Sequence, residues 1–402
     1  MNPWLAVIGI GAEGIEGLMP AARALVDAAE VLVGSARHLA MIPPGPTPRM
    51  TWRNPLVETM RDIAAHRGRR VVVLASGDPL WHGVGTTLLR HFERDEMIVL
   101  PHSSAYSLAA ARMRWPLAEC TTLTLHGRPI ERLALFLTPG ARLLILSEDG
   151  STPERVSDFL AARGWGESRL TALEAMGGGA EHRREGLARD WLHGRIADLN
   201  TLAVECVAGP GARPLSHMAG LPDDAFRHDG QITKRTVRAA TLAALAPLPG
   251  ERLWDVGAGA GSIAIEWLRG GGGSAMALER ERSRTALIAE NAALLGVPEL
   301  AIVTGEAPAA LAGLPAPDAV FLGGGLATPG LFEAAWRALK PGGRLVANAV
   351  TLEGEARLLA WHQAHGGRLI RVSVAEAERL GAHHAWRMLM PVTQLTLVKV
   401  SP

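Results

Sequence analysis

Two glycine-rich turns, each directly after a short hydrophobic run, constrain the fold of this 402-residue chain more than any other feature. The first lies in VIGIGAEG at residues 7–14, and the second lies in RLWDVGAGAG at residues 252–261. Glycine lets a backbone turn tightly and approach a ligand closely, so each turn marks a candidate binding loop. Around both turns, aliphatic runs alternate with segments whose apolar residues recur every three or four positions. This alternation predicts an α/β fold with mainly parallel sheets.

The predicted strands divide into two blocks. Buried strands are expected at residues 71–74, 143–146, 203–207, 252–256, 275–278 and 344–347, and an antiparallel pair at 369–374 and 394–400 closes the sequence. Three prolines and three glycines interrupt the periodicity over residues 207–224, which is typical of a linker. We therefore expect one domain over 1–206, a linker over 207–224 and a second domain over 225–402.

The composition narrows the class of protein. The 41 basic and 40 acidic residues nearly cancel, which disfavours a nucleic-acid binder, and 48% hydrophobic residues exclude whole-chain disorder. Cys120 and Cys206 are too few for a disulfide framework or a zinc site, so no metal is expected. No signal peptide and no membrane span are expected, because Asp78 and His82 interrupt the longest apolar stretch. These features predict a cytoplasmic protein that acts on small molecules and does not bind membranes.

The C-terminal turn has the spacing G-x-G-x-G rather than the dinucleotide spacing G-x-G-x-x-G. It resembles the first motif of class I S-adenosylmethionine (SAM) methyltransferases. The predicted cofactor residues here are Asp255 at the strand end and Gly257, Ala258, Gly259 and Gly261 in the turn. A structural turn is the alternative for any one of these glycines.

Two later segments follow in the order expected of that fold. Glu279 ends the next strand, 22 positions beyond Gly257, where a carboxylate suits the ribose hydroxyls; a solvated carboxylate at a helix start is the alternative. Gly305, Glu306 and Ala307 follow a third strand, where class I enzymes place residues around adenine.

The N-terminal turn fits G-x-G-x-x-G through Gly9, Gly11 and Gly14, yet the acidic residue required for dinucleotide binding is misplaced. The nearest candidate, Glu30, precedes the second strand instead of ending it. Two further loops carry Gly77, Asp78 and Pro79, and Ser103, Ser104 and Ala105, with Ser103-Ser104 as a helix N-cap. The alternatives for these residues are loop glycines, a β-turn and an ordinary capped helix. Together the three loops resemble class III methyltransferases, which have the tetrapyrrole methylase fold.

The order of the two halves carries the resemblance further. VIGIGAEG, ASGDPLWHGVG, HSSAYSLA and HGRP, followed by GQITKRTVRA, LWDVGAGAGSIAIEW, GEAP, VFLGGG and LVANAVTLEG, resemble the decarboxylating precorrin-6Y C(5,15)-methyltransferase family of cobalamin biosynthesis. The resemblance implies one SAM per domain and a corrinoid (precorrin) substrate. The N-terminal domain would methylate meso carbon 5. The C-terminal domain would methylate carbon 15 and decarboxylate the carbon 12 acetate, giving precorrin-8.

This chemistry requires alignment rather than a nucleophilic side chain, because the meso carbon of the reduced tetrapyrrole is itself electron rich. We therefore assign no catalytic residue. The substrate carries several carboxylates, so cations should orient it. The predicted substrate residues are Lys234, Arg238 and Asn348 in the C-terminal half and His126 and Arg128 in the N-terminal half. Thr233 is either a SAM contact or a helix N-cap, and the turn at His126 is either functional or simply exposed.

Three other functions remain open from the sequence. An NAD-dependent dehydrogenase would use the turn at Gly9–Gly14, a SAM-dependent RNA methyltransferase would need a basic stripe, and a SAM-sensing scaffold would have an inactive domain. Parent folds commonly associate, so a homo-oligomer is expected.

Overall fold

The computed structural model describes residues 3–400 and separates into two compact units. Unit 1 comprises Met1–Ile130 and Thr138–Arg213, and unit 2 comprises Glu131–Leu137 and Pro214–Pro402. The chain crosses from one unit to the other within the segment 207–224, where we predict the linker. The assignment of Glu131–Leu137 to unit 2 has no signal in the sequence.

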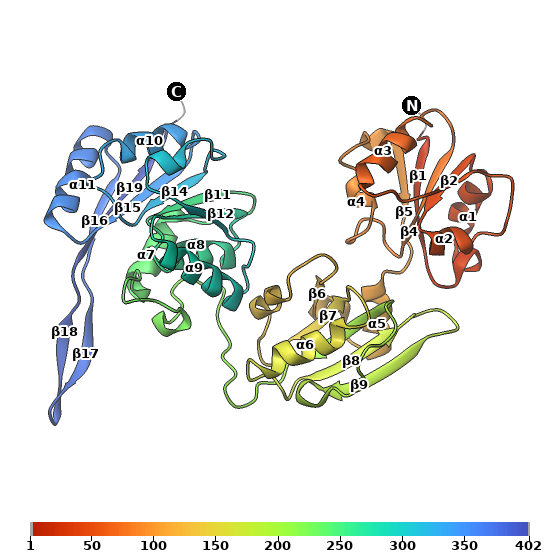
Figure 1. The fold of residues 1–402 in the computed structure, drawn as a ribbon, viewed down its shortest axis with the longest axis horizontal. Helices are drawn as coiled ribbons and strands as arrows, with labels where there is room; N and C mark the ends of the chain where they lie inside the picture. The colour runs from red at the N-terminus through yellow and green to blue at the C-terminus, as the bar shows by residue number, and fades with distance from the viewer. Residues whose placement is uncertain (1–2, 401–402) are drawn as a thin grey trace. The chain divides into compact units, whose positions relative to one another are not determined.

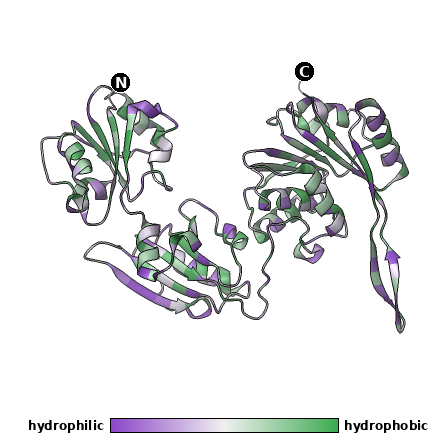
Figure 2. Cartoon of the chain, turned by 180° about the vertical axis from the view of Figure 1, so that it is seen from behind, coloured by the Kyte–Doolittle hydropathy of each residue, from purple (hydrophilic) through white to green (hydrophobic). Residues whose placement is uncertain are grey.

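The first sheet of unit 1 is wholly parallel, with strand order β3-β2-β4-β1-β5. Its strands are β1 (Leu5–Ile10), β2 (Val31–Gly34), β3 (Arg49–Thr51), β4 (Val71–Ser76) and β5 (Met97–Leu100), accompanied by helices α1 (Pro20–Asp27), α2 (Ala36–Ala40), α3 (Leu56–Ala64) and α4 (Gly85–Leu88). Both faces of the sheet are covered by separate apolar clusters, one around Ile8 and one around Val7. The continuous apolar runs of β1 and β4 follow from this two-sided burial (Figures 1 and 2).

The second sheet of unit 1 corrects our expectation of parallel pairing. Its order is β6-β7-β10-β8-β9, and only the pair β6–β7 is parallel. The elements are β6 (Cys120–Thr124), β7 (Arg142–Leu146), β8 (Arg169–Glu174), β9 (His182–Leu187) and β10 (Asn200–Glu205), with α5 (Ala105–Met113) and α6 (Thr152–Ala161). An apolar run shows burial but not strand direction, so the prediction of mainly parallel pairing does not hold for this sheet, although it holds for the other two large sheets.

Unit 2 contains a seven-stranded sheet of order β13-β12-β11-β14-β15-β19-β16. The strands are β11 (Arg252–Val256), β12 (Ser274–Glu279), β13 (Ala301–Thr304), β14 (Ala319–Leu322), β15 (Arg344–Ala349), β16 (Arg368–Val372) and β19 (Val392–Val398). The helices are α7 (Arg235–Leu245), α8 (Ser262–Arg269), α9 (Arg282–Leu294), α10 (Leu331–Ala338) and α11 (Leu352–His365). Strands β11 to β15 are parallel, and β19 pairs antiparallel with β15 and β16, which confirms the predicted closing pair.

A two-stranded hairpin, β17 (Ala375–Leu380) and β18 (His383–Met388), interrupts the closing pair and was not predicted. Figure 1 shows it projecting from unit 2. None of its residues is buried, and Trp386 is 75% exposed. The sequence signal of a half-buried strand is therefore weak here. Among residues 3–400, no helix is long and apolar enough to cross a membrane, and no group of His, Cys, Asp or Glu side chains could hold a metal ion.

Gly261 supports a first prediction, because this N-cap residue of helix α8 packs against Ile288 of helix α9. Its φ is +75°, and a Cβ there would lie 2.8 Å from Cγ2 of Ile288. Gly261→Ala should lower the free energy of unfolding by about 1–3 kcal/mol more than Gly313→Ala, measured by urea denaturation. Gly313 is the matched control, because its φ is +76° but a Cβ there would meet no atom within 4 Å. Equal losses would show that backbone conformation alone requires the glycine.

Candidate functional site

A cavity of about 930 Å³ lies in unit 2 at the carboxyl ends of the parallel strands. This volume is within the range of about 300–1,000 Å³ that small-molecule sites occupy. Ten of the predicted residues line it, from five separate segments: Thr233, Lys234, Gly257, Ala258, Gly259, Glu279, Gly305, Glu306, Ala307 and Asn348. The carboxyl ends of parallel strands meet at one edge of a sheet, which explains why loops distant in sequence converge here.

Glu279 connects two of these loops. Its side chain is 5% exposed; Oε2 accepts a hydrogen bond from the Gly259 N–H at 2.9 Å, and Oε1 accepts from the N–H groups of Arg280 and Glu281 at 3.0 and 3.1 Å. The backbone donors hold the carboxylate in a fixed orientation at the cavity wall. This arrangement fits a cofactor with ribose hydroxyls, and the narrow wall at Gly257, where a Cβ would lie 3.1 Å from the Gly324 nitrogen, fits a closely bound ligand.

Two predicted cofactor residues lie behind the cavity rather than in its wall. The Asp255 side chain is buried; Oδ2 accepts from the Ala264 N–H at 3.0 Å, and Oδ1 has no hydrogen-bond partner among the described residues. Burial raises the pKa of Asp255 to about 7, and the nearby negative charge of Glu279 also raises it. Gly261 packs against Ile288 instead of facing the cavity. Both residues position helix α8.

Arg238, which we predicted to bind substrate, is fully buried and does not reach the cavity. It donates to Glu266 at 2.6 Å and to Asp223 at 3.0 Å, and its guanidinium also donates to the Thr233 and Leu221 carbonyls. These contacts tie the loop before α7 to helix α8. Arg238 therefore acts as a positioning residue for the cavity wall.

The segment of the cavity wall before α7 does not fit the alternative in which Thr233 is the N-cap of the helix. Helix α7 begins at Arg235 with Lys234 at its N-cap position, so Thr233 does not cap it. Lys234 is exposed, lines the cavity, and lies 3.9 Å from the Asp223 carboxylate. The Lys234 ammonium is thus available to a ligand.

Asn348 lines the cavity with a fixed orientation. Its Nδ2 donates to Thr241 Oγ1 at 2.8 Å, and its Oδ1 accepts from Gln394 Nε2 at 3.0 Å. Gln394 also donates to Thr241 Oγ1 at 3.1 Å. This network from β15, α7 and β19 leaves one amide hydrogen of Asn348 for a ligand.

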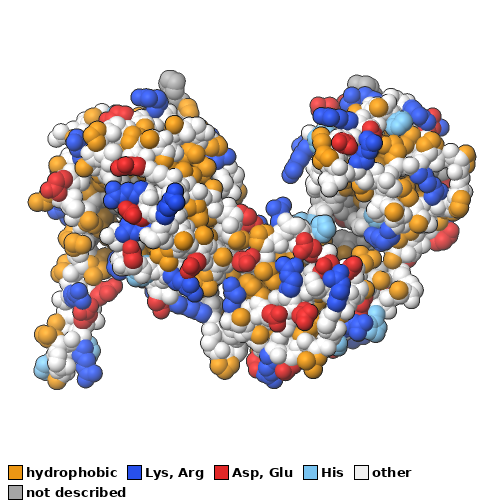
Figure 3. All heavy atoms as spheres, viewed as in Figure 1, with side chains coloured by type: hydrophobic (Ala, Val, Ile, Leu, Met, Phe, Trp, Pro, Cys, Tyr) orange, Lys and Arg blue, Asp and Glu red, His pale blue; other side chains and the backbone are white. Residues whose placement is uncertain are grey.

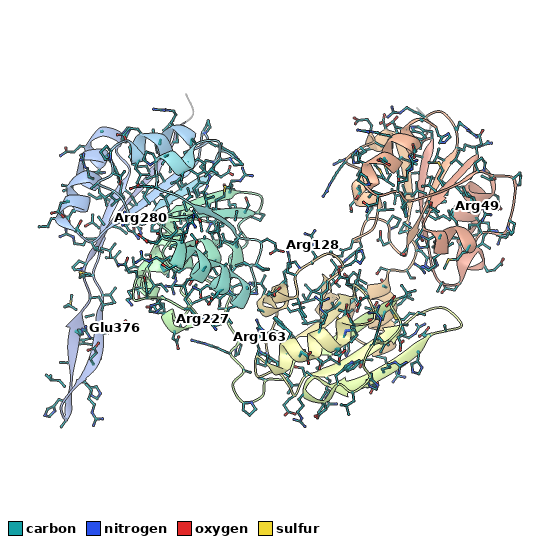
Figure 4. The ribbon with its side chains drawn as sticks, in the orientation of Figure 1. Arg49, Arg128, Arg163, Arg227, Arg280 and Glu376 are labelled. Carbon is teal, nitrogen blue, oxygen red and sulfur yellow. The ribbon has the colours of Figure 1, made fainter. Side chains whose placement is uncertain are left out.

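Several cavity residues were missed by the sequence analysis: Gln231, Arg235, Arg280, Arg284, Glu376, Leu389 and Met390. Arg280 directly follows Glu279, so its position could have been inferred. Glu376 and Met390 come from the base of the hairpin, which had no sequence signal. Figure 4 labels Arg280 and Glu376, which belong to different parts of unit 2. Figure 3 shows basic and acidic side chains interspersed over the visible face.

In unit 1, the three predicted loops meet in a three-loop cluster, formed by residues 9–11, 77–79 and 102–105. A Cβ on Gly9 would lie 1.9 Å from the Gly77 carbonyl oxygen and 2.5 Å from the His102 nitrogen. The backbone is cross-linked here, because Gly77 N–H donates to Ile10 O at 3.2 Å and His102 N–H donates to Gly77 O at 3.1 Å. Only glycine permits this approach.

The other predicted residues of the three loops lie around the contact between Gly9 and Gly77. Asp78 Oδ1 accepts from the Leu80 N–H at 2.9 Å, which stabilises the turn around buried Pro79. Ser104 caps α5 by accepting from the Ser107 N–H at 3.0 Å, as predicted. The rest are placed as follows: Gly11 faces Glu13 and His102, Ser103 is exposed, and Ala105 begins α5.

His126 and Arg128 lie on an exposed turn after β6 (Figure 4 labels Arg128). His126 N–H donates to Thr124 Oγ1 at 3.1 Å, and Arg128 N–H donates to Leu125 O at 3.2 Å. These backbone contacts shape the turn but give neither side chain a partner. Their role in substrate binding stays a prediction.

Comparison with known proteins identifies both halves. Residues 5–190 match the Tetrapyrrole (Corrin/Porphyrin) Methylases, and residues 224–399 match the Precorrin methyltransferase domain. The chain is 48% identical to a Sinorhizobium protein named precorrin-6Y C(5,15)-methyltransferase [decarboxylating], covering 99% of this chain and 97% of the relative.

Shorter relatives match less than half of the chain. A Salmonella typhimurium cobalt-precorrin-7 C(5)-methyltransferase is 33% identical over 42% of this chain and 84% of its own length. A Pyrobaculum aerophilum protein, named a probable cobalt-precorrin-6B C(15)-methyltransferase (decarboxylating), is 34% identical over 44% of this chain and 94% of its own. The family and fold classes predicted from the motifs are confirmed.

Asp255 gives a pH-dependent prediction. An unfolded Asp ionises near pH 3.9, whereas folded Asp255 keeps its proton to about pH 7, so the folded state binds more protons in between. The contribution of Asp255 to the free energy of unfolding should therefore fall as pH rises from 4 to 7. Asp255→Asn cannot ionise, and it should reduce the fall between pH 5 and pH 8 by on the order of 2 kcal/mol, measured by urea denaturation. An unchanged pH dependence would contradict the assignment.

Arg238 gives a stability prediction. Arg238→Met leaves Glu266 and Asp223 without their buried counter-charge and should cost about 3–5 kcal/mol of unfolding free energy. The control is Arg235→Met, because Arg235 is exposed on the same helix and donates only to the Gly220 carbonyl. That change should cost less than about 1 kcal/mol. Similar losses in the two variants would refute the structural role of Arg238.

Proposed function

The chain belongs to the family of decarboxylating precorrin-6Y C(5,15)-methyltransferases, and from this premise we propose that its two units divide the reaction. Unit 1 methylates meso carbon 5. Unit 2 methylates meso carbon 15 and decarboxylates the acetate at carbon 12. Each unit holds one SAM, and neither dinucleotide reduction nor RNA methylation is the activity.

The observation that carries this proposal is that each unit brings its predicted cofactor loops together at the carboxyl ends of parallel strands. Unit 2 has the cavity with Glu279 at its wall, and unit 1 has the three-loop cluster around Gly9 and Gly77. The shorter relatives support the same division, because one is named for carbon 5 methylation and the other for carbon 15 methylation with decarboxylation.

When bound, SAM supplies an electrophilic methyl group on a sulfonium centre. In unit 2, Glu279 would accept hydrogen bonds from the ribose hydroxyls, while Glu306 and Ala307 would lie beside adenine. In unit 1, the glycines let the three loops pack closely, and the cluster that they form would hold the cofactor. The protein contributes alignment at near-attack distance, and this accounts for most of the acceleration expected in such transfers.

The substrate would be oriented by cations of the cavity wall. Lys234, Arg280 and Arg284 come from three different segments and all face the cavity. Arg284 is steadied by Asp229 at 3.0 Å, which leaves its outer nitrogens for a carboxylate. The amide of Asn348 adds a fixed neutral donor.

The test uses the full chain with one unit disabled at a time. Gly9→Ala should abolish methylation at carbon 5 but retain methylation at carbon 15 and loss of carbon dioxide, because only the three-loop cluster is disrupted. Glu279→Gln should have the reverse effect. Products formed with isotope-labelled methyl donor are identified by mass and by carbon NMR. Calorimetry with S-adenosylhomocysteine should give two sites in the unaltered chain and one in each variant.

The control for unit 1 is Gly45→Ala, since a Cβ at Gly45 would meet no atom within 4 Å and both activities should persist. A single donor site in the unaltered chain would overturn the proposal. So would a Gly9→Ala variant that still methylates carbon 5 at the normal rate.

A further inference from the structure

Arg37, on helix α2 of unit 1, is a cation without a counter-ion. Its Nη2 donates to Ser76 Oγ at 3.0 Å and lies 3.0 Å from Nε2 of His38. Across residues 3–400, no carboxylate forms an ion pair with it, and burial lowers the pKa of its guanidinium. The residue is nevertheless exposed, so its charge remains open to a ligand.

The neighbours of Arg37 orient the guanidinium without neutralising it. The His38 ring is buried, and its Nε2 lies 3.0 Å from Ser76 Oγ. Burial and the Arg37 charge lower the pKa of His38 to about 4, so the ring is neutral at neutral pH and its Nε2 can accept a hydrogen bond. Nη2 of the guanidinium is thereby fixed, and among residues 3–400 its Nε and Nη1 have no hydrogen-bond partner.

Helix α2 is held at both ends, which makes the position of Arg37 rigid. The Ser35 side chain caps the N-terminus by accepting from the His38 N–H at 3.2 Å. At the other end, Arg49 donates to the carbonyls of Leu39 at 2.7 Å and Ile42 at 3.1 Å (Figure 4). Such preorganisation reduces the entropy cost of binding a ligand.

Arg37 also lies beside the three-loop cluster. Its partner Ser76 is the last residue of β4, pairs with Ile10 of β1, and directly precedes Gly77. This is the carboxyl edge of a parallel sheet, where ligands of such folds bind.

We propose that Arg37 is a carboxylate-binding residue of unit 1, with His38 and Ser76 as its positioning residues. The inference rests on the proposed function, because it assumes that unit 1 binds SAM and a precorrin. Both ligands carry carboxylates, on the methionine portion of SAM and on the side chains of the macrocycle. The guanidinium suits either, since its Nε and Nη1 remain to donate a charge-assisted hydrogen bond to a carboxylate.

The test compares Arg37→Gln, Arg37→Lys and a matched control, Arg61→Gln, in the full chain. Arg61 is an exposed arginine on helix α3, which accompanies the same sheet. Its replacement therefore removes the same charge at a different position of unit 1. Two quantities are measured: the KM for precorrin-6Y in carbon 5 methylation, and the calorimetric affinities for S-adenosylhomocysteine and 5′-methylthioadenosine, which lacks the carboxylate. Thermal melting verifies that each variant is folded.

If the carboxylate belongs to the macrocycle, Arg37→Gln should raise the KM for precorrin-6Y about tenfold or more and leave both nucleoside affinities unchanged. If it belongs to SAM, S-adenosylhomocysteine should bind one of its two sites about tenfold or more weakly, while methylthioadenosine binds as before. Arg37→Lys should be intermediate in either case, because it keeps the charge but cannot contact Ser76, His38 and the carboxylate with one planar group.

The proposal is overturned if Arg37→Gln matches Arg61→Gln in every measurement. A failure of the proposed function looks different, because the unaltered chain would then not methylate carbon 5. In that event the two nucleoside affinities still decide whether Arg37 binds a carboxylate.

Discussion

Close contact between loop backbones at the carboxyl ends of parallel strands is the constraint on which both units depend. In unit 1 the contact is direct, because the Gly9 backbone lies against the Gly77 carbonyl and the His102 nitrogen. In unit 2 a carboxylate mediates it, because Glu279 accepts from the Gly259 N–H. Parallel strands bring their carboxyl ends to one edge, but they do not fix the loops there. The glycines and Glu279 supply that local order.

Unit 2 has charged groups behind its site as well as in the cavity wall. Arg238, Glu266 and Asp223 form a buried ionic network behind the cavity wall, and Asp255 holds helix α8 through the Ala264 N–H. Buried charges of this kind contribute little net stability, yet breaking one leaves an expensive uncompensated partner. The network therefore specifies one geometry for the loop carrying Thr233 and Lys234. Its value to the protein is the position of the cavity wall rather than a direct contact with ligand.

The sequence was sufficient for those parts of the fold that local rules determine. Strands β4, β11, β12 and β15 were predicted because both of their faces are buried, and the loops after them were located by glycine spacing. The direction of pairing in the second sheet and the hairpin β17–β18 could not be found, since pairing depends on distant strands and the hairpin has no buried face. Arg238 shows the corresponding limit for sites: an arginine beside a predicted loop is as consistent with a buried ionic network as with a substrate contact, and only the burial decides.

The reaction proposed for this family explains why a cation that binds substrate needs different surroundings from those of Arg238. A substrate that provides its own nucleophilic carbon needs only to be held, and a carboxylate is held best by a cation whose position is fixed but whose charge is still available. Arg238 has lost that availability to Glu266 and Asp223. Arg37 keeps it, because Ser76 and neutral His38 fix the guanidinium with dipoles alone. In both units, the chemical identity of the partner, rather than the proximity of an arginine to a predicted loop, decides whether the residue can serve a ligand.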